Sequence, residues 1–100
     1  MVSINEELKA AKAARAAIDV LLTATSRSAA VATLNKAKHV AVLNLGSGGS
    51  LNAARANVGI AISNVIHALP TAEKIDKAER AIEAWIVELE AAKLYSVGGA

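Results

Sequence analysis

The sequence predicts an all-α fold, a single antiparallel four-helix bundle, and three observations lead to this prediction. Of the 100 residues, 24 are alanine, the strongest helix former, and only one is proline. Apolar residues recur at alternating spacings of three and four in four separate stretches. The segments between these stretches are rich in hydroxyl residues, glycine or proline, which favour turns. A chain of this length is expected to form one domain, residues 1–100, with one hydrophobic core.

The first helical hairpin is expected to cover about residues 3–45. Ser3 and Glu6 have the spacing of a capping box, so the first helix should begin beside them. Hydroxyl residues over 23–28 predict a turn, with Thr25 or Ser26 capping the second helix. A continuous helix over residues 4–43 stays open as the alternative. The expected core stripe of the first helix is Ile4, Leu8, Ala11, Ile18 and Leu22.

The second helix becomes apolar on all sides in its last turns, so we expect this end to be buried or docked. Its apolar residues are Val31, Leu34, Ala41, Val42 and Leu45 on one side, joined by Val40 and Leu43. The following run from Gly46 to Ser50 cannot hold a helix because glycine loses too much backbone freedom, and it predicts a flexible loop. Whether this loop is natural or an engineered linker stays open.

The second hairpin is expected over about residues 51–96. Ser50 should cap the third helix, and Pro70 should end it at Leu69. Thr71 should cap the fourth helix, which is expected to run to about Leu94, with a frayed tail over residues 97–100. Its expected core positions are Ile75, Ala78, Ile82, Trp85, Ile86 and Leu89.

The two hairpins resemble each other in sequence. Residues 8–13 match residues 51–56, and residues 34–39 match residues 75–80. A duplicated hairpin would explain these matches. Alanine-rich helices also match by chance, and the alignment needs one extra residue within the third helix. Duplication is therefore left open.

Charge is distributed unevenly along the chain, although the net charge is only +2. Residues 8–58 carry seven Lys or Arg against one acid, whereas residues 73–90 carry six acids and three bases. The two parts could neutralise each other within one bundle, or the basic part could meet an acidic partner. Four acids form a ridge on the fourth helix that we expect to be solvated: Asp76, Glu79, Glu83 and Glu90. We expect it to be supported by pairs from Glu73 to Lys77 and from Asp76 to Arg80.

Two basic residues fall within apolar stripes, Arg15 in the first helix and Lys38 in the second. A buried unpaired cation would be costly, so each should extend to solvent or find an acid.

Chemistry-bearing patterns are sparse, and we expect a protein that is not an enzyme and binds no cofactor. The chain has no cysteine, and neither His39 nor His67 has a second ligand at helical spacing, so we expect no metal site. The string from Val40 through the glycines to Ser50 reads like a strand entering a nucleotide-binding loop. No ribose-binding acid follows at the required distance, so nucleotide binding at residues 46–50 is a remote alternative.

The third helix carries the most informative surface. Its apolar stripe is backed by uncharged residues where solvent normally selects Lys and Glu: Asn57, Ile60, Ser63, Asn64 and His67. We expect another surface, of the same bundle or of a partner, to cover this side. The candidate interface residues here are Asn57, Ile60, Asn64 and His67.

The fourth helix holds a second apolar stripe that begins where the charges on that side stop. Its residues are Ala84, Val87, Ala91 and Leu94, with Tyr95 beside them. Such a patch is typical of a binding surface, unless other parts of the same bundle wrap it. The function predicted from these two surfaces is that of a small helical protein-interaction module. It would dock on another protein or self-associate, as assembly factors, adaptors and inhibitors do, including phage and mobile-element proteins.

The main alternative is nucleic-acid binding through basic residues of the first three helices: Lys9, Lys12, Lys36, Lys38 and Arg55. These residues are dispersed and lack aromatic stacking partners, which makes this alternative the weaker one. Acidic residues precede the first apolar run, unlike in a secretion signal, and polar residues interrupt the uncharged stretch over 56–72. We therefore expect a soluble cytoplasmic protein with no membrane partner.

Overall fold

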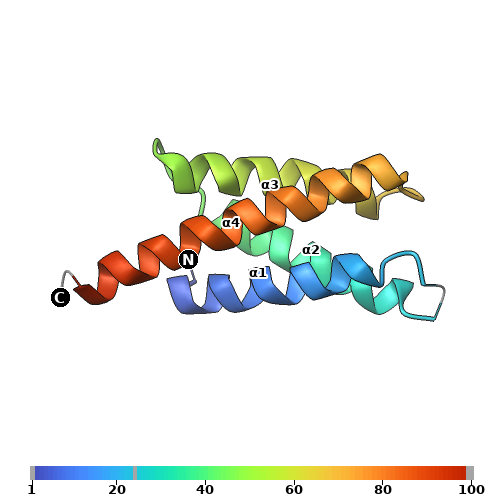
Figure 1. Cartoon of the computed structure of the whole chain (residues 1–100), viewed down its shortest axis with the longest axis horizontal. Coiled ribbons are helices and arrows are strands. Elements are labelled where there is room, and N and C mark those ends of the chain that lie inside the picture. The colour runs from blue at the N-terminus through green and yellow to red at the C-terminus, as the bar shows by residue number, and fades with distance from the viewer. Residues whose placement is uncertain (1, 24, 99–100) are drawn as a thin grey trace.

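The described part of the chain is all-α and forms four antiparallel helices, as the sequence predicts. The computed structural model describes residues 2–23 and 25–98, and it contains α1 (Ile4–Asp19), α2 (Arg27–Leu43), α3 (Ser50–Ile66) and α4 (Ala72–Gly98). The helices run alternately up and down, and α1 packs on α2, α2 on α3, α3 on α4 and α4 on α1 (Figure 1). This closed ring of contacts defines an up-and-down four-helix bundle.

The break between the first two helices is confirmed, and the continuous-helix alternative is wrong. Ser3 caps α1 as expected, because its Oγ accepts a hydrogen bond from the Glu6 backbone N–H at 3.1 Å. Short-range backbone bonds tie the segment after Asp19, including Val20 N to Ala17 O at 3.2 Å. Ser26 occupies the N-cap position of α2, but its hydroxyl makes no capping bond, so the predicted side-chain cap is absent.

The second hairpin differs from prediction mainly at its helix ends. Thr71 caps α4, because its Oγ1 accepts from the Lys74 N–H at 3.2 Å. Gly49, with φ 87°, is the N-cap of α3, so the predicted cap Ser50 is the first helical residue instead. α3 ends at Ile66, three residues before the predicted Leu69. α4 continues to Gly98, so residues 97 and 98 are helical, and the rest of the predicted frayed tail, residues 99–100, lies outside the described residues.

The core is built from alanines between larger side chains, which lets the helices approach closely. The largest fully buried side chains are Trp85, Leu21, Leu34, Ile62, Ile82, Leu89, Glu7, Val58 and Val65. Leu22 was predicted in the core, but it is exposed and Leu21 is buried in its place. The reason is that α1 ends at Asp19, and the three-residue bonding of the following turn shifts the helical phase.

The last turn of α2, which was predicted to be buried or docked, is buried by the bundle on one side only. Val42, Leu43 and Leu45 are about half exposed, whereas Val40 and Ala41 point into the bundle. This helix end is apolar on every side, so the sequence does not show which of its side chains face the core and which face outwards. The Val42 side chain packs towards Gly59 of α3. A Cβ added at Gly59 would lie 3.5 Å from Val42 Cγ2.

Candidate protein-interaction surface

A buried polar cluster holds the four helices together at one level of the bundle. It consists of Glu7, Asn44, Arg55 and Trp85, which come from α1, the end of α2, α3 and α4. The Glu7 carboxylate is fully buried and accepts hydrogen bonds from all three partners. The Nε and Nη2 atoms of Arg55 donate at 2.8 and 2.7 Å, Asn44 Nδ2 donates at 2.8 Å and Trp85 Nε1 donates at 2.9 Å.

The cluster satisfies a charge that would otherwise be very costly to bury. Arg55 is only 8% exposed and meets the carboxylate with two parallel N–H donors, the strongest geometry for such a pair. The indole N–H of Trp85, which a buried tryptophan must place on an acceptor, reaches the same carboxylate. Because each partner lies on a different helix, the cluster fixes the register of all four helices.

The pKa of the Glu7 carboxyl is lowered from its ordinary value of 4.5. Burial acts to raise this pKa, but the hydrogen bonds from Arg55, Asn44 and Trp85, with the Arg55 charge, outweigh it. Since the pKa is lower in the folded state than in the unfolded state, ionised Glu7 stabilises the fold at neutral pH. That contribution is lost as the pH falls below about 4.5 towards the folded-state pKa.

This shift predicts an acid dependence that can be assigned to one residue. The urea midpoint of the wild-type protein should fall as the pH is lowered from 6 to about 3. In Glu7→Gln, which starts from a lower stability, the fall should be shallower because the residue no longer titrates. Glu6→Gln removes the neighbouring exposed carboxyl and is the control for the loss of one acidic side chain. Equal slopes for wild type and Glu7→Gln would contradict the assignment.

The glycine loop is tied to this cluster by Asn52. Its Oδ1 accepts from the Gly46 N–H at 2.8 Å and from Arg55 Nη1 at 3.0 Å, and its Nδ2 donates to the Gly48 carbonyl at 2.6 Å. Gly48 and Gly49 have positive φ, a backbone conformation that disfavours residues with a Cβ, and this accounts for glycine at both positions. The residues before the loop are helical to Leu43, so the strand that a dinucleotide-binding unit requires is not present there.

A second polar group joins α1 to α4 near the bundle surface. Arg15 donates to Asp19, Glu79 and Glu83, each at 3.0 Å, so it finds acids as predicted. Its hydrogen bond with Asp19 is the main reason that the pKa of Arg15 is raised. Glu79 is half-buried beside α1, whereas Asp76, Glu83 and Glu90 are exposed, so the predicted solvated ridge holds for these three acids. The predicted pairs from Glu73 to Lys77 and from Asp76 to Arg80 are present.

The outer face of α3, Asn57, Ile60, Asn64 and His67, is not covered by the described part of the chain. All four residues are exposed, and the Ile60 side chain is 65% exposed. Asn57, Ile60 and Asn64 line a shallow groove of about 180 Å³ beside Lys74 and Lys77 of α4. The described part of the bundle therefore does not cover this side.

The outer stripe of α4, Ala84, Val87, Ala91 and Leu94, is also exposed. The exposed fractions are 64% for Val87 and 74% for Leu94, and they reach 84% for the neighbouring Tyr95. The alternative in which the bundle wraps this stripe does not hold for the described residues. Trp85 lies in the same helical turn as the start of the stripe, so the buried polar cluster anchors α4 just beneath it.

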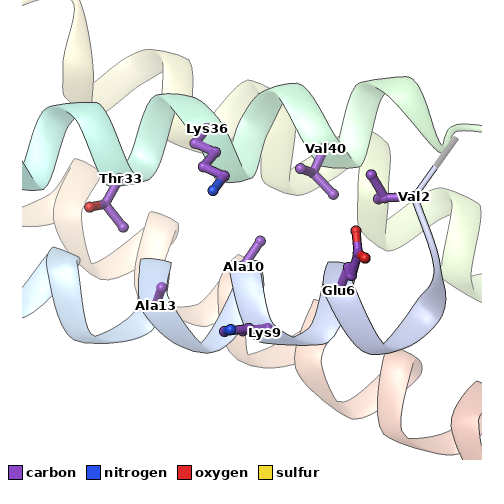
Figure 2. Close-up of a pocket in the computed structure, with 8 residues that line it drawn as sticks. All are labelled: Val2, Glu6, Lys9, Ala10, Ala13, Thr33, Lys36 and Val40. Atoms are coloured by element: carbon purple, nitrogen blue, oxygen red, sulfur yellow. The ribbon is translucent and has the colours of Figure 1, made fainter.

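The structure brings together three of the five basic residues predicted to bind nucleic acid, Lys9, Lys36 and Lys38, and places Lys12 and Arg55 elsewhere. Lys9 and Lys36 line a groove of about 480 Å³ between α1 and α2, with Glu6, Ala10 and Thr33 also along its walls (Figure 2). Lys36 shares a second concave surface of α2 with Lys38. Lys12 lies 3.9 Å from Glu90, and Arg55 is in the buried polar cluster rather than on the surface.

Sequence reasoning missed the buried polar cluster, although three signals were present. Glu7 lies next to Leu8 and four residues before Ala11, which places it on the inner face of α1. Arg55 precedes Ile62 by seven residues and so shares its face of α3. A lone tryptophan in a core stripe also needs an acceptor for its N–H. Glu7 and Arg55 carry opposite charges and lie within the core stripes of two helices, and Trp85 lies in a third. Together these three positions would have indicated the buried ion pair.

Comparisons with known protein families, curated proteins and solved structures gave no match to this chain. None of the described helices is long and apolar enough to cross a membrane. Within residues 2–23 and 25–98 there is no group of three or more His, Cys, Asp or Glu that could hold a metal ion.

Proposed function

We propose that this protein is a small non-enzymatic helical module that binds protein through the outer face of α3 and the outer stripe of α4. The observation that carries the proposal is the exposure of large apolar side chains, Ile60, Val87, Leu94 and Tyr95, on two adjacent helices. Val87, Leu94 and Tyr95 lie along the second half of α4, and exposed apolar side chains that gather in this way are typical of protein-binding surfaces. Ile60 lies on α3 beside Lys74 and Lys77.

The buried polar cluster supports this proposal because it makes the surface rigid. Glu7 joins α3 and α4 through Arg55 and Trp85, so the two exposed faces keep a fixed relation to each other. A preorganised surface loses less conformational entropy when it binds.

The proposal is tested by site-specific photocrosslinking in cells that naturally produce the protein. A photoreactive amino acid at Val87 or Ile60 should give protein adducts, either with another copy of the chain or with a different protein. The same group at Ala32, an exposed position on α2, is the matched control. The adducts should decrease when Leu94→Glu is added but persist with Leu69→Glu, an equally exposed leucine outside the surface. Adducts no stronger than at Ala32 would remove the proposal.

A further inference from the structure

The outer stripe of α4 has the spacing and size pattern of a helix-pairing seam. Ala84, Val87, Ala91 and Leu94 follow one another at steps of three, four and three, which is the a/d spacing of a coiled coil. Small and large side chains alternate along it. No charged residue interrupts the seam from Ala84 to Leu94, whereas Arg80 occupies its preceding position.

α4 is also longer than the bundle that it belongs to. It has 27 residues, whereas α2 and α3 have 17 each, and ten more residues add about 15 Å of helix. Figure 1 shows this extra length as a C-terminal end that projects beyond the starts of α1 and α3. Leu94 and Tyr95 lie near this end and are the most exposed large apolar residues of α4.

We propose that a second copy of this chain covers the outer stripe of α4, with the two α4 helices antiparallel about a twofold axis near residue 89. This inference rests on the proposed function and names the partner. In that register Val87 of one copy lies opposite Ala91 of the other, and Leu94 lies opposite Ala84. Each large side chain thus meets a small one, which is the arrangement that fills space between closely packed helices.

The length of α4 selects the antiparallel orientation. Two antiparallel α4 helices place each projecting end on the bundle of the other copy, so both exposed ends are covered. A parallel pair would place Leu94 opposite Leu94 and Ala91 opposite Ala91, and its two projecting ends would cover no part of either bundle.

Charge complementarity points to the same arrangement. The last turn of α4 contains no basic residue, so the negative end of its helix dipole has no cation from its own turn. About a twofold axis at residue 89, Arg80 of one copy lies at the level where α4 of the other copy ends. Arg80 pairs with Asp76 of its own helix through Nε at 3.0 Å, but its side chain is 78% exposed, so the rest of the guanidinium is accessible to that helix end.

Three acids flank the seam, Glu83, Glu88 and Glu90. An axis at residue 89 brings Glu88 of one copy opposite Glu90 of the other, so their mutual repulsion opposes this pairing, and Glu88 has only the Ser50 hydroxyl as a hydrogen-bond donor. Glu83 is bonded to Arg15 at 3.0 Å, and Glu90 lies 3.9 Å from Lys12, so each copy partly neutralises its own flank. On the other flank, Asn57 and Ile60 of α3 share a groove with Lys77, which lies one helical turn before Arg80. The projecting end of the second copy would therefore approach the outer face of α3 as well.

Cysteine crosslinking tests both the partner and the orientation, because the natural chain contains no cysteine. Val87→Cys and Ala91→Cys are purified separately as chains of different length, so that mixed and same-position disulfides can be distinguished by size. The two variants are then mixed and oxidised. Antiparallel pairing predicts that the mixed disulfide forms at least about ten times faster than either same-position disulfide, since only the mixed pair has the short separation that a disulfide needs. Faster 87-to-87 or 91-to-91 crosslinks would overturn the antiparallel arrangement.

Sedimentation at micromolar concentrations gives the second readout. The wild-type chain should sediment as a dimer, and Leu94→Glu should raise the dissociation constant about tenfold or more. Leu69→Glu, at 78% exposure against 74% for Leu94, is the matched control and should leave the dimer intact. Circular dichroism should show that both variants are folded. A monomeric wild-type chain without the mixed crosslink would overturn this inference. Photocrosslinks from Val87 to a different protein would still support the proposed function.

Discussion

Replacing Glu7 with alanine is expected to lower the free energy of unfolding by about 3–5 kcal/mol, a large share of the total for a domain of this size. The physical reason is that the substitution leaves the buried Arg55 charge without its counterion. It also leaves the Trp85 N–H and one Asn44 donor bond without their carboxylate acceptor. Urea unfolding followed by far-UV circular dichroism measures this change.

Glu6→Ala is the matched control for this prediction. Glu6 is the preceding residue, lies in the same first turn and is exposed, so its loss should cost less than about 1 kcal/mol. If Glu7→Ala costs no more than Glu6→Ala, the ion pair does not stabilise the bundle. A double variant, Glu7→Met with Arg55→Met, should be less destabilised than the sum of the single variants, because neither charge is then left alone.

Trp85→Ala is expected to lower the free energy of unfolding by about 3–5 kcal/mol as well, because the largest buried side chain is removed from a closely packed core. Trp85→Phe keeps most of the ring volume but removes the N–H donor to Glu7. Its expected cost is smaller, about 1–3 kcal/mol. Chemical unfolding at low protein concentration measures both variants independently of any association.

Leu69→Ala provides the control for Trp85, because this leucine lies on the surface between α3 and α4. Its expected effect is within about 0.5 kcal/mol. A Trp85→Phe variant as stable as wild type would mean that the bond from the indole N–H to Glu7 contributes no net stability.

Helix number, order and most turns followed from local chemistry. The cap at Ser3, the hydroxyl-rich turn before α2, the glycines between residues 46 and 49 and the cap at Thr71 each act within a few residues, so sequence spacing alone reveals them. The positions that differ depend on phase or on tertiary contacts. Leu22 is exposed because the chain leaves the α-helical period after Asp19.

The candidate surface and the buried polar cluster were predictable to different degrees. One side of α3 and one side of the second half of α4 lack charged residues, and this absence identified the residues of the candidate surface. It did not show whether the rest of the bundle would cover them. Glu7 and Arg55 are 48 positions apart in the sequence. A charge in a core stripe can reach solvent along a neighbouring groove or meet an opposite charge, and only the packing of all four helices decides between these outcomes.

The distribution of donors and acceptor in the buried polar cluster ties the two halves of the chain into one cooperative unit. The anion lies in the first half, whereas the guanidinium and the indole that neutralise and cap it lie in the second. Neither half alone can bury its share of these groups without a large desolvation cost. A break in the peptide backbone at the glycine loop would therefore leave two fragments that must recombine before either acquires a core.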